Sequence, residues 1–146
     1  MRMNYTMMGD TVNLAARLEP AAKQYGVYTI VAQNTYKVVK DQFEWRMLDY
    51  LTVKGKKKPV KAYELFSVKD DLNNDQSQLI TAFNEGIDLY FKQEWNKALS
   101  KFKEASELEE DFPDRPTTPS LIYIQRCEFF SKNPNSKSEI PESLKI

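Results

Sequence analysis

Asn13 and Arg17 are the two side chains whose types and spacing best suit chemistry on a phosphate. They lie four residues apart in GDTVNLAARLE, so a helix would present both on one face. Asp10 is placed to cap that helix, and a helix N-terminus favours anions. An arginine fork can bind phosphate oxygens, and an asparagine amide can hold a ribose oxygen. A surface polar pair beside an N-cap explains the same pattern, so the residues alone leave both interpretations open.

A further candidate lies in a basic turn, where Lys54 precedes a glycine. The turn region also contains Lys56, Lys57, Lys58 and Lys61. Such a run usually keeps a hairpin tip soluble, yet Lys54 would end a strand and could be aimed at a site. No stacking aromatics alternate with these lysines and the chain has zero net charge, so nucleic acid is not an expected partner.

The composition excludes several kinds of chemistry. Histidine is absent, which removes Ser-His-Asp and Cys-His catalysis and imidazole metal ligands. The acidic residues of the first half form no evident pair facing Asn13 and Arg17, so the residues predict no metal site. The single cysteine, Cys127, cannot form an internal disulfide and is expected to be a small buried residue. Without a long apolar run or a signal-peptide core, we expect no membrane segment and a cytoplasmic location.

Hydrophobic periodicity places the candidates in an α+β unit over residues 1–68. The helix that carries Asn13 and Arg17 should end at Gly26, because glycine suits a helix C-cap. The predicted order is strand, helix, strand, helix, strand, strand, over residues 3–8, 11–26, 27–31, 33–41, 43–53 and 60–68.

The last two of these strands are predicted to form a hairpin around the basic turn. Along 43–53, apolar residues alternate with Glu44 and Arg46. This period of two predicts a strand with one buried face and one wet face, the latter carrying Glu44 and Arg46.

The second half is predicted to be helical, over residues 78–132, after a linker at 69–77. Two helices form a hairpin, and a third covers about 120–130. The polar tail 133–146 is expected to be disordered. Residues 1–70 carry 12 Lys/Arg and 7 Asp/Glu, a net charge of +5, and the rest carries 9 and 14, a net charge of −5. This asymmetry indicates two units with different roles.

Two stretches of the first unit carry a family resemblance. YTMMGDTVNLAARLE (5–19), followed by LTVKGKKKPVKAYEL (51–65), closely resembles the C-terminal half of a class III nucleotide cyclase catalytic domain. The resemblance implies part of a ferredoxin-like cyclase sheet with helices. It also implies a bacterial adenylate cyclase, which converts ATP to cyclic AMP and pyrophosphate in signal transduction.

The resemblance assigns a role to each candidate. Asn13 matches the residue that orients the ribose, and Arg17 the residue that stabilises charge on the α-phosphate as the 3′-oxygen attacks. Lys54 matches the lysine that holds the terminal phosphates. Thr6 falls where the family reads the purine, and a threonine there is similar to the bacterial ATP-using branch. The choice between ATP and GTP stays open.

The resemblance also implies metal ions and a second catalytic domain. The family uses Mg²⁺ or Mn²⁺, held by two aspartates that lie N-terminal to the Asn/Arg motif and therefore outside this sequence. Its site lies between two domains, so the expected partner is a second copy or a complementary cyclase half. We expect the chain alone to make no cyclic nucleotide, and strand edges at 3–8 or 27–31 to favour a non-native dimer.

The helical half resembles one tetratricopeptide repeat in FNEGIDLYFKQEWNKALSKFKEASEL. Gly86, Trp95, Ala98, Phe102 and Ala105 fall at the intervals of that repeat. A lone repeat needs a neighbour for stability, and such repeats imply a protein partner. The alternatives are a plain helical hairpin packed on the cyclase half and, for function, a non-catalytic interaction module.

Overall fold

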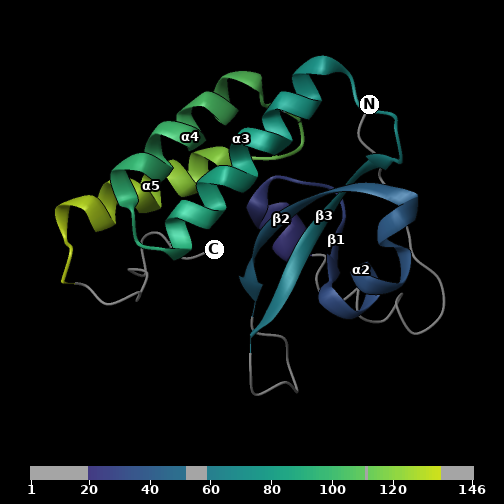
Figure 1. Ribbon diagram of the computed structural model, residues 1–146, viewed down its shortest axis with the longest axis horizontal. Coiled ribbons are helices and arrows are strands. Elements are labelled where there is room, and N and C mark those ends of the chain that lie inside the picture. The colour runs from purple at the N-terminus through teal and green to yellow at the C-terminus, as the bar shows by residue number, and fades with distance from the viewer. Residues whose placement is uncertain (1–19, 52–58, 111, 136–146) are drawn as a thin grey trace.

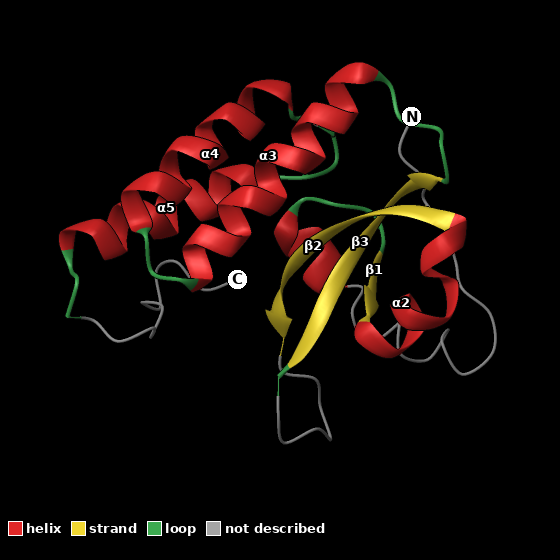
Figure 2. Cartoon of the chain, in the orientation of Figure 1, coloured by secondary structure: helices red, strands yellow, loops and turns green. Residues whose placement is uncertain are grey.

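Figure 1 shows the computed structural model, which describes residues 20–51, 59–110 and 112–135. The predicted strand at 3–8 and residues 136–146 lie outside this part of the chain. After helical residues 20–25, the elements are β1 (Ile30–Ala32), α2 (Gln33–Val39), the 3-10 turn η1 (Lys40–Gln42), β2 (Phe43–Leu51), β3 (Val60–Val68), α3 (Asn74–Phe91), α4 (Trp95–Leu108) and α5 (Pro119–Lys132). Strands and helices mix in the first half and helices alone form the second (Figure 2), which confirms an α+β chain.

The strands form one antiparallel sheet in the order β1-β3-β2. The predicted hairpin is confirmed, since β2 pairs with β3 from Phe43–Val68 to Leu51–Val60. Strand β1 begins only at Ile30 rather than at the expected residue 27. The chain turns into it at Gly26, whose φ of +79° is a left-handed conformation that glycine adopts freely. The predicted end of the first helix is thereby confirmed.

The two faces of the sheet have different covers (Figure 1). Helix α2 packs on one face, where Val31 and Leu65 contact an aromatic group formed by Tyr36, Phe43, Trp45 and Tyr63. The helices α3, α4 and α5 cover the other face, where they share one hydrophobic core with Leu48, Ala62 and Phe66.

The expectation of a wet face on β2 is wrong for Arg46. Arg46 has no exposed surface, whereas Glu44 is only partly buried near the end of the strand. The reason is the helical second half, which covers the sheet face that Arg46 and Leu48 share. Period-two alternation identifies the faces of a strand but not which of them a distant segment will cover.

Helices α3 and α4 form the expected hairpin and pack side by side (Figure 1). Helix α3 begins at Asn74, four residues before the expected 78, because Asn73 and Gln76 form a reciprocal capping box. Gln93, with φ of 63°, reverses the chain between the helices. The expected third helix is confirmed as α5. The packing is that of a helical hairpin on the sheet, while the tetratricopeptide assignment stays a prediction.

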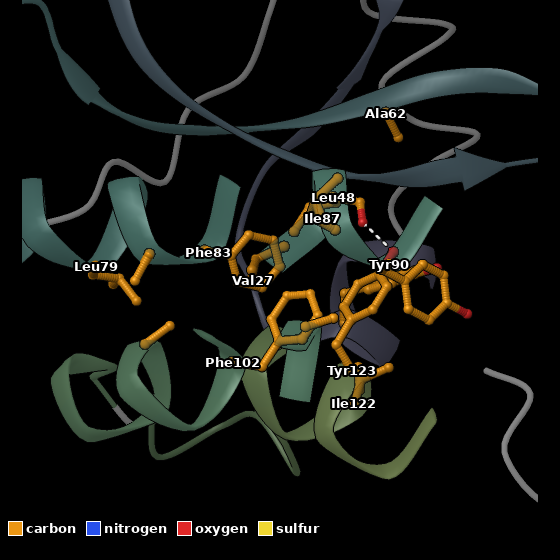
Figure 3. Close-up of a cluster of buried hydrophobic side chains, with 14 of the residues drawn as sticks. Val27, Leu48, Ala62, Leu79, Phe83, Ile87, Tyr90, Phe102, Ile122 and Tyr123 are labelled. Atoms are coloured by element: carbon orange, nitrogen blue, oxygen red, sulfur yellow. Dashed lines mark hydrogen bonds between the residues drawn. The ribbon is translucent and has the colours of Figure 1, made fainter. Parts of the chain in front are cut away.

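Aromatic rings fill the core between the helices and the sheet (Figure 3). The ring of Tyr123 stacks on Phe102 at a centroid distance of 4.9 Å and meets Phe83 edge to face at 5.8 Å. The dashed line in Figure 3 marks the hydrogen bond that the Tyr123 hydroxyl donates to the Leu48 carbonyl oxygen, 2.6 Å away. This bond ties α5 to β2. Cys127 lies in the same core and is fully buried, as expected. None of the helices described here is long and apolar enough to cross a membrane.

We predict that Gly86→Ala destabilises the chain. A Cβ at this position would lie 2.8–3.0 Å from ring atoms of Phe102, and that ring is fully buried and stacked, so it has little room to move. Overpacking costs about 1–3 kcal/mol, which outweighs the ~1 kcal/mol gained by replacing a helical glycine. Urea unfolding measures the difference in the free energy of unfolding between Gly86→Ala and the parent. The control is the double variant Gly86→Ala/Phe102→Leu, in which the ring that the new Cβ would meet is absent. A Gly86→Ala chain more stable than the parent would contradict this packing.

Candidate active site

The four predicted site residues lie outside the described residues. Thr6, Asn13 and Arg17 belong to residues 1–19, and Lys54 belongs to residues 52–58. The structure therefore tests none of their roles and describes instead the segments that flank them. These are residues 20–29, which follow Arg17 in the chain, and the pair Leu51–Val60, which closes the base of the hairpin.

Tyr25, at the end of helical residues 20–25, is held by a buried charge cluster. Its side chain is 2% exposed, and its hydroxyl donates a hydrogen bond to Oδ2 of Asp49 on β2. The same carboxylate oxygen accepts from Nη1 of Arg126 on α5 at 2.8 Å. The other carboxylate oxygen accepts from the backbone N–H of Tyr50 at 2.7 Å. Asp49 thus joins the end of the first helix, the sheet and α5.

The loop between α4 and α5, residues 112–118, holds the chain just after Tyr25. A Cβ on Gly26 would lie 1.9 Å from the carbonyl oxygen of Thr117, so only glycine allows this approach. Nε of Arg115 donates to the carbonyl oxygen of Val27 at 2.9 Å. The guanidinium of Arg115 also lies 4.8 Å from the ring centroid of Tyr28, whose hydroxyl donates to Asp114 at 3.0 Å. The segment after the predicted site helix is therefore fastened to the helical half.

A second buried cluster centres on Arg46. Its guanidinium forms ion pairs with Glu64 of β3 at 2.7 Å and with Glu109, just after α4, at 2.8 Å. Oε1 of Glu109 also accepts from the hydroxyl of Ser120 on α5 at 2.9 Å. The guanidinium lies 4.7 Å from the ring centroid of Phe83, which adds a cation–π contact. Two carboxylates and an aromatic face thus surround one fully buried cation.

Burial and charge shift several pKa values in this core. Burial opposes the charged form of Arg46, but the carboxylates of Glu109 and Glu64 outweigh it and raise the pKa of the guanidinium. Burial, reinforced by Asp49, raises the pKa of Tyr123 well above its ordinary value, and burial raises the pKa of Tyr90 to about 12. Burial also raises the pKa of the Cys127 thiol to about 12. The thiol is therefore protonated at neutral pH and unsuited to nucleophilic chemistry.

The residues of these clusters were not identified as partners from the sequence, although two signals were present. Arg46 and Glu64 are opposite each other in the β2–β3 register, so the hairpin itself predicts a cross-strand ion pair. Arg126 lies on the helix face that carries Tyr123 and Phe130, a position that indicates a buried partner for its charge. Nothing in the sequence indicates that its partner is Asp49.

The described residues do not fit a metal ion. Among residues 20–51, 59–110 and 112–135, no three acidic or cysteine side chains come together in a group that could hold one. The buried carboxylates of Asp49, Glu64 and Glu109 are each paired with arginine instead.

A surface groove lies where α3 passes the open part of the sheet. It has a volume of about 420 Å³ and is lined by residues of α2, β2, β3 and α3. Tyr50 and Phe91, each 44% exposed, meet edge to face there, with ring centroids 5.2 Å apart. Lys61, Asp88 and Lys92 supply charges of both signs to its lining. The groove therefore combines exposed aromatic surface with charges of both signs.

The comparison with protein families matches the first half of the chain to one family model. Residues 1–67 match the family model of the adenylate and guanylate cyclase catalytic domain. The match contains all four predicted site residues, and its end coincides with the end of β3 to within one residue. The resemblance of residues 1–68 to a cyclase domain is therefore confirmed, and the observed mixed sheet-and-helix architecture agrees with it.

Three similar proteins are each named an adenylate cyclase. The terminal-differentiation-specific adenylate cyclase of Dictyostelium discoideum is 36% identical over 130 residues, which cover 86% of this chain and 6% of that protein. Adenylate cyclase 1 of Rhizobium meliloti (strain 1021) is 34% identical over 76 residues, 52% of this chain and 11% of that protein. An adenylate cyclase of Anabaena cylindrica is 33% identical over 67 residues, 44% of this chain and 13% of that protein. No solved structure matches.

The lengths of these alignments carry information. The chain spans only 6–13% of the relatives' lengths, so it corresponds to a small part of each. The Dictyostelium similarity covers 86% of the chain and so continues beyond residue 67, through α3 and α4. The helical half thus accompanies the cyclase segment in at least one relative.

We predict that Arg46→Met destabilises the chain by about 3–5 kcal/mol, because it leaves two buried carboxylates without their cation. The matched control is Lys101→Met, which removes a cation from the exposed pair with Glu85 and should cost at most ~1 kcal/mol. Denaturant unfolding of both variants checks this. Adding Glu64→Leu and Glu109→Leu to Arg46→Met should restore stability, since no unpaired charge remains. Equal effects of Arg46→Met and Lys101→Met would contradict the cluster's importance.

We predict that stability falls as the pH rises above 9. In the unfolded chain the Cys127 thiol loses its proton near its ordinary pKa of 9.0, whereas the folded chain retains it to about 12. The unfolded state then binds fewer protons, so the free energy of unfolding falls with pH by at most about 1.4 kcal/mol per pH unit per group. This contribution is intact below pH 9 and lost as the pH rises from 9 to about 12. Cys127→Ala should delay the onset to about pH 10, where Tyr90 begins to contribute; an unchanged onset in chemical unfolding at several pH values would refute it.

Proposed function

We propose that this chain is part of an adenylate cyclase that converts ATP to cyclic AMP and pyrophosphate in signal transduction. The observation that carries the proposal is the match of residues 1–67 to the cyclase catalytic domain. The three relatives, each named an adenylate cyclase, support ATP over GTP as the substrate. A cytoplasmic location belongs to the same proposal.

The proposed roles follow from the chemistry of cyclisation. The 3′-oxygen attacks the α-phosphorus, the bond to the bridging oxygen of the β-phosphate breaks, and pyrophosphate leaves with that oxygen. Arg17 stabilises the negative charge that gathers on the α-phosphate oxygens, a role that can be worth ~10³–10⁵ in rate. Asn13 orients the ribose, Lys54 holds the departing phosphates, and Thr6 contacts the purine.

The proposed active form is a dimer of this chain with a complementary cyclase half, whereas a pair of two copies of this chain is proposed to be inactive. The resemblance assigns the metal-binding aspartates to residues that precede the Asn/Arg motif. We therefore propose that this chain contributes the ribose and phosphate contacts, and that Mg²⁺ or Mn²⁺ is held by carboxylates of the complementary domain. The chain by itself is proposed to be inactive.

The test is complementation. The chain is mixed with a second chain that carries the metal-binding aspartates, and cyclic AMP formation from ATP is measured. We predict activity with the parent chain and a loss of at least ~10³-fold with Arg17→Ala, because its charge is needed in the transition state. Lys23→Ala is the matched control, since Lys23 is an exposed cation six residues further along. Full activity of Arg17→Ala would refute the assignment.

A second candidate function is that of a non-catalytic module in which the helical half binds a protein partner. The groove between α3 and the sheet favours it, because Tyr50 and Phe91 expose aromatic surface there. The two functions separate in the same experiment. Absence of cyclic nucleotide with every aspartate-bearing half, together with partner binding that Phe91→Ser abolishes, would favour the module.

A further inference from the structure

We infer that Asp49 and Arg126 are positioning residues for the cyclase site and act on it through Tyr25. The inference rests on the proposed function. It assigns the helical half a part in catalysis, as the support that holds the segment following Arg17 in place. Neither Asp49 nor Arg126 is assigned contact with the substrate.

The contact that holds Tyr25 is directional. An apolar contact would let the segment slide, whereas the Tyr25 hydroxyl must meet one oxygen of Asp49. That oxygen is itself fixed by Arg126 at 2.8 Å, and the neighbouring carboxylate oxygen is fixed by the backbone of Tyr50. All three residues of the contact are at most 9% exposed, so water competes little for these bonds.

This anchor lies close to the proposed site along the chain. Tyr25 follows Arg17 by eight residues, and Gly26 and Val27 are held by the loop 112–118 through two separate contacts. Arg126 of α5 and the loop that leads into α5 thus hold neighbouring points of this segment. Transition-state contacts tolerate little displacement, and a shift of about 1 Å can cost ~10²-fold in rate.

The helices and the cyclase segment share one core. One hydrophobic cluster contains Leu48 and Phe66 of the sheet together with Phe83 of α3 and residues of α4 and α5, so α3–α5 are not a separately folded appendage of the described sheet. The Dictyostelium adenylate cyclase shows similarity across the same junction. The similarity to a protein named adenylate cyclase therefore includes α3 and α4.

The test is Tyr25→Phe in the complementation assay, with Tyr28→Phe as the control. Both changes remove one hydroxyl, but only that of Tyr25 is buried against a charge cluster, while that of Tyr28 reaches the exposed Asp114. We expect Tyr25→Phe to lower kcat about tenfold and to change KM for ATP less than about twofold, because Arg17 acts in the transition state. Tyr28→Phe should leave both unchanged. Arg126→Gln should show the same kcat loss. An unchanged kcat in folded Tyr25→Phe and Arg126→Gln would overturn the inference.

A second measurement does not depend on activity. Amide hydrogen exchange of residues 11–27 is followed in the chain itself, and Tyr25→Phe should exchange at least about tenfold faster than Tyr28→Phe there. Equal exchange would overturn the anchoring. If the parent mixture makes no cyclic nucleotide, the proposed function fails, and the exchange rates still decide whether Tyr25 anchors this segment. If Arg126→Gln does not fold, the decision rests on Tyr25→Phe, which retains the Asp49–Arg126 pair.

Discussion

The fully buried guanidinium of Arg46 is the constraint on which the arrangement of the sheet and helices depends. A cation on the inner face of a strand costs several kcal/mol to desolvate unless carboxylates and aromatic faces surround it. Glu64 of the same hairpin supplies one carboxylate, but Glu109, beyond α4, supplies the other. The sheet face is therefore satisfied only when α4 and α5 lie across it, which relates the register of the helices to that of the hairpin.

This requirement explains why the two halves of the chain form one structure despite their different compositions. The first half has a net charge of +5 and the second −5, and a simple attraction would place cations on the sheet against anions on the helices. The Arg46–Glu109 pair follows that polarity, but the Asp49–Arg126 pair reverses it. Two buried pairs of opposite polarity specify a single register, because sliding the helices would place like charges together. The opposite net charges account for the attraction between the two halves, and the reversed Asp49–Arg126 pair fixes the register of the helices on the sheet.

Much of the fold could be predicted from local signals. The hairpin over residues 60–68 and its partner strand, the three helices and the left-handed turn at Gly26 all follow from periodicity and residue type. The burial of Arg46 could not be predicted, because a covered face and a solvent-exposed face of a strand have the same period in the sequence. The true start of β1 also could not be predicted, since Tyr28 and Val27 are held by contacts with a loop 86 and 88 residues further along the chain. For the site, the family motifs predict roles for Asn13 and Arg17, whereas the Asp49–Arg126 support depends on tertiary contacts.

The same tertiary contacts alter how the helical half is understood. In a repeat-like hairpin, small residues on one helix pack against aromatic rings on the other, and Gly86 packs against Phe102 in this way. Yet the rings that fill the hairpin, Phe83, Phe102 and Tyr123, belong to the core that contains Leu48 of the sheet. A surface already committed to the sheet cannot also serve as a repeat's binding face. Any partner of this half must therefore approach the sides of the helices that the sheet leaves open. A displacement of the helices would disturb the contacts that hold Tyr25 and Gly26, which follow Arg17 in the chain.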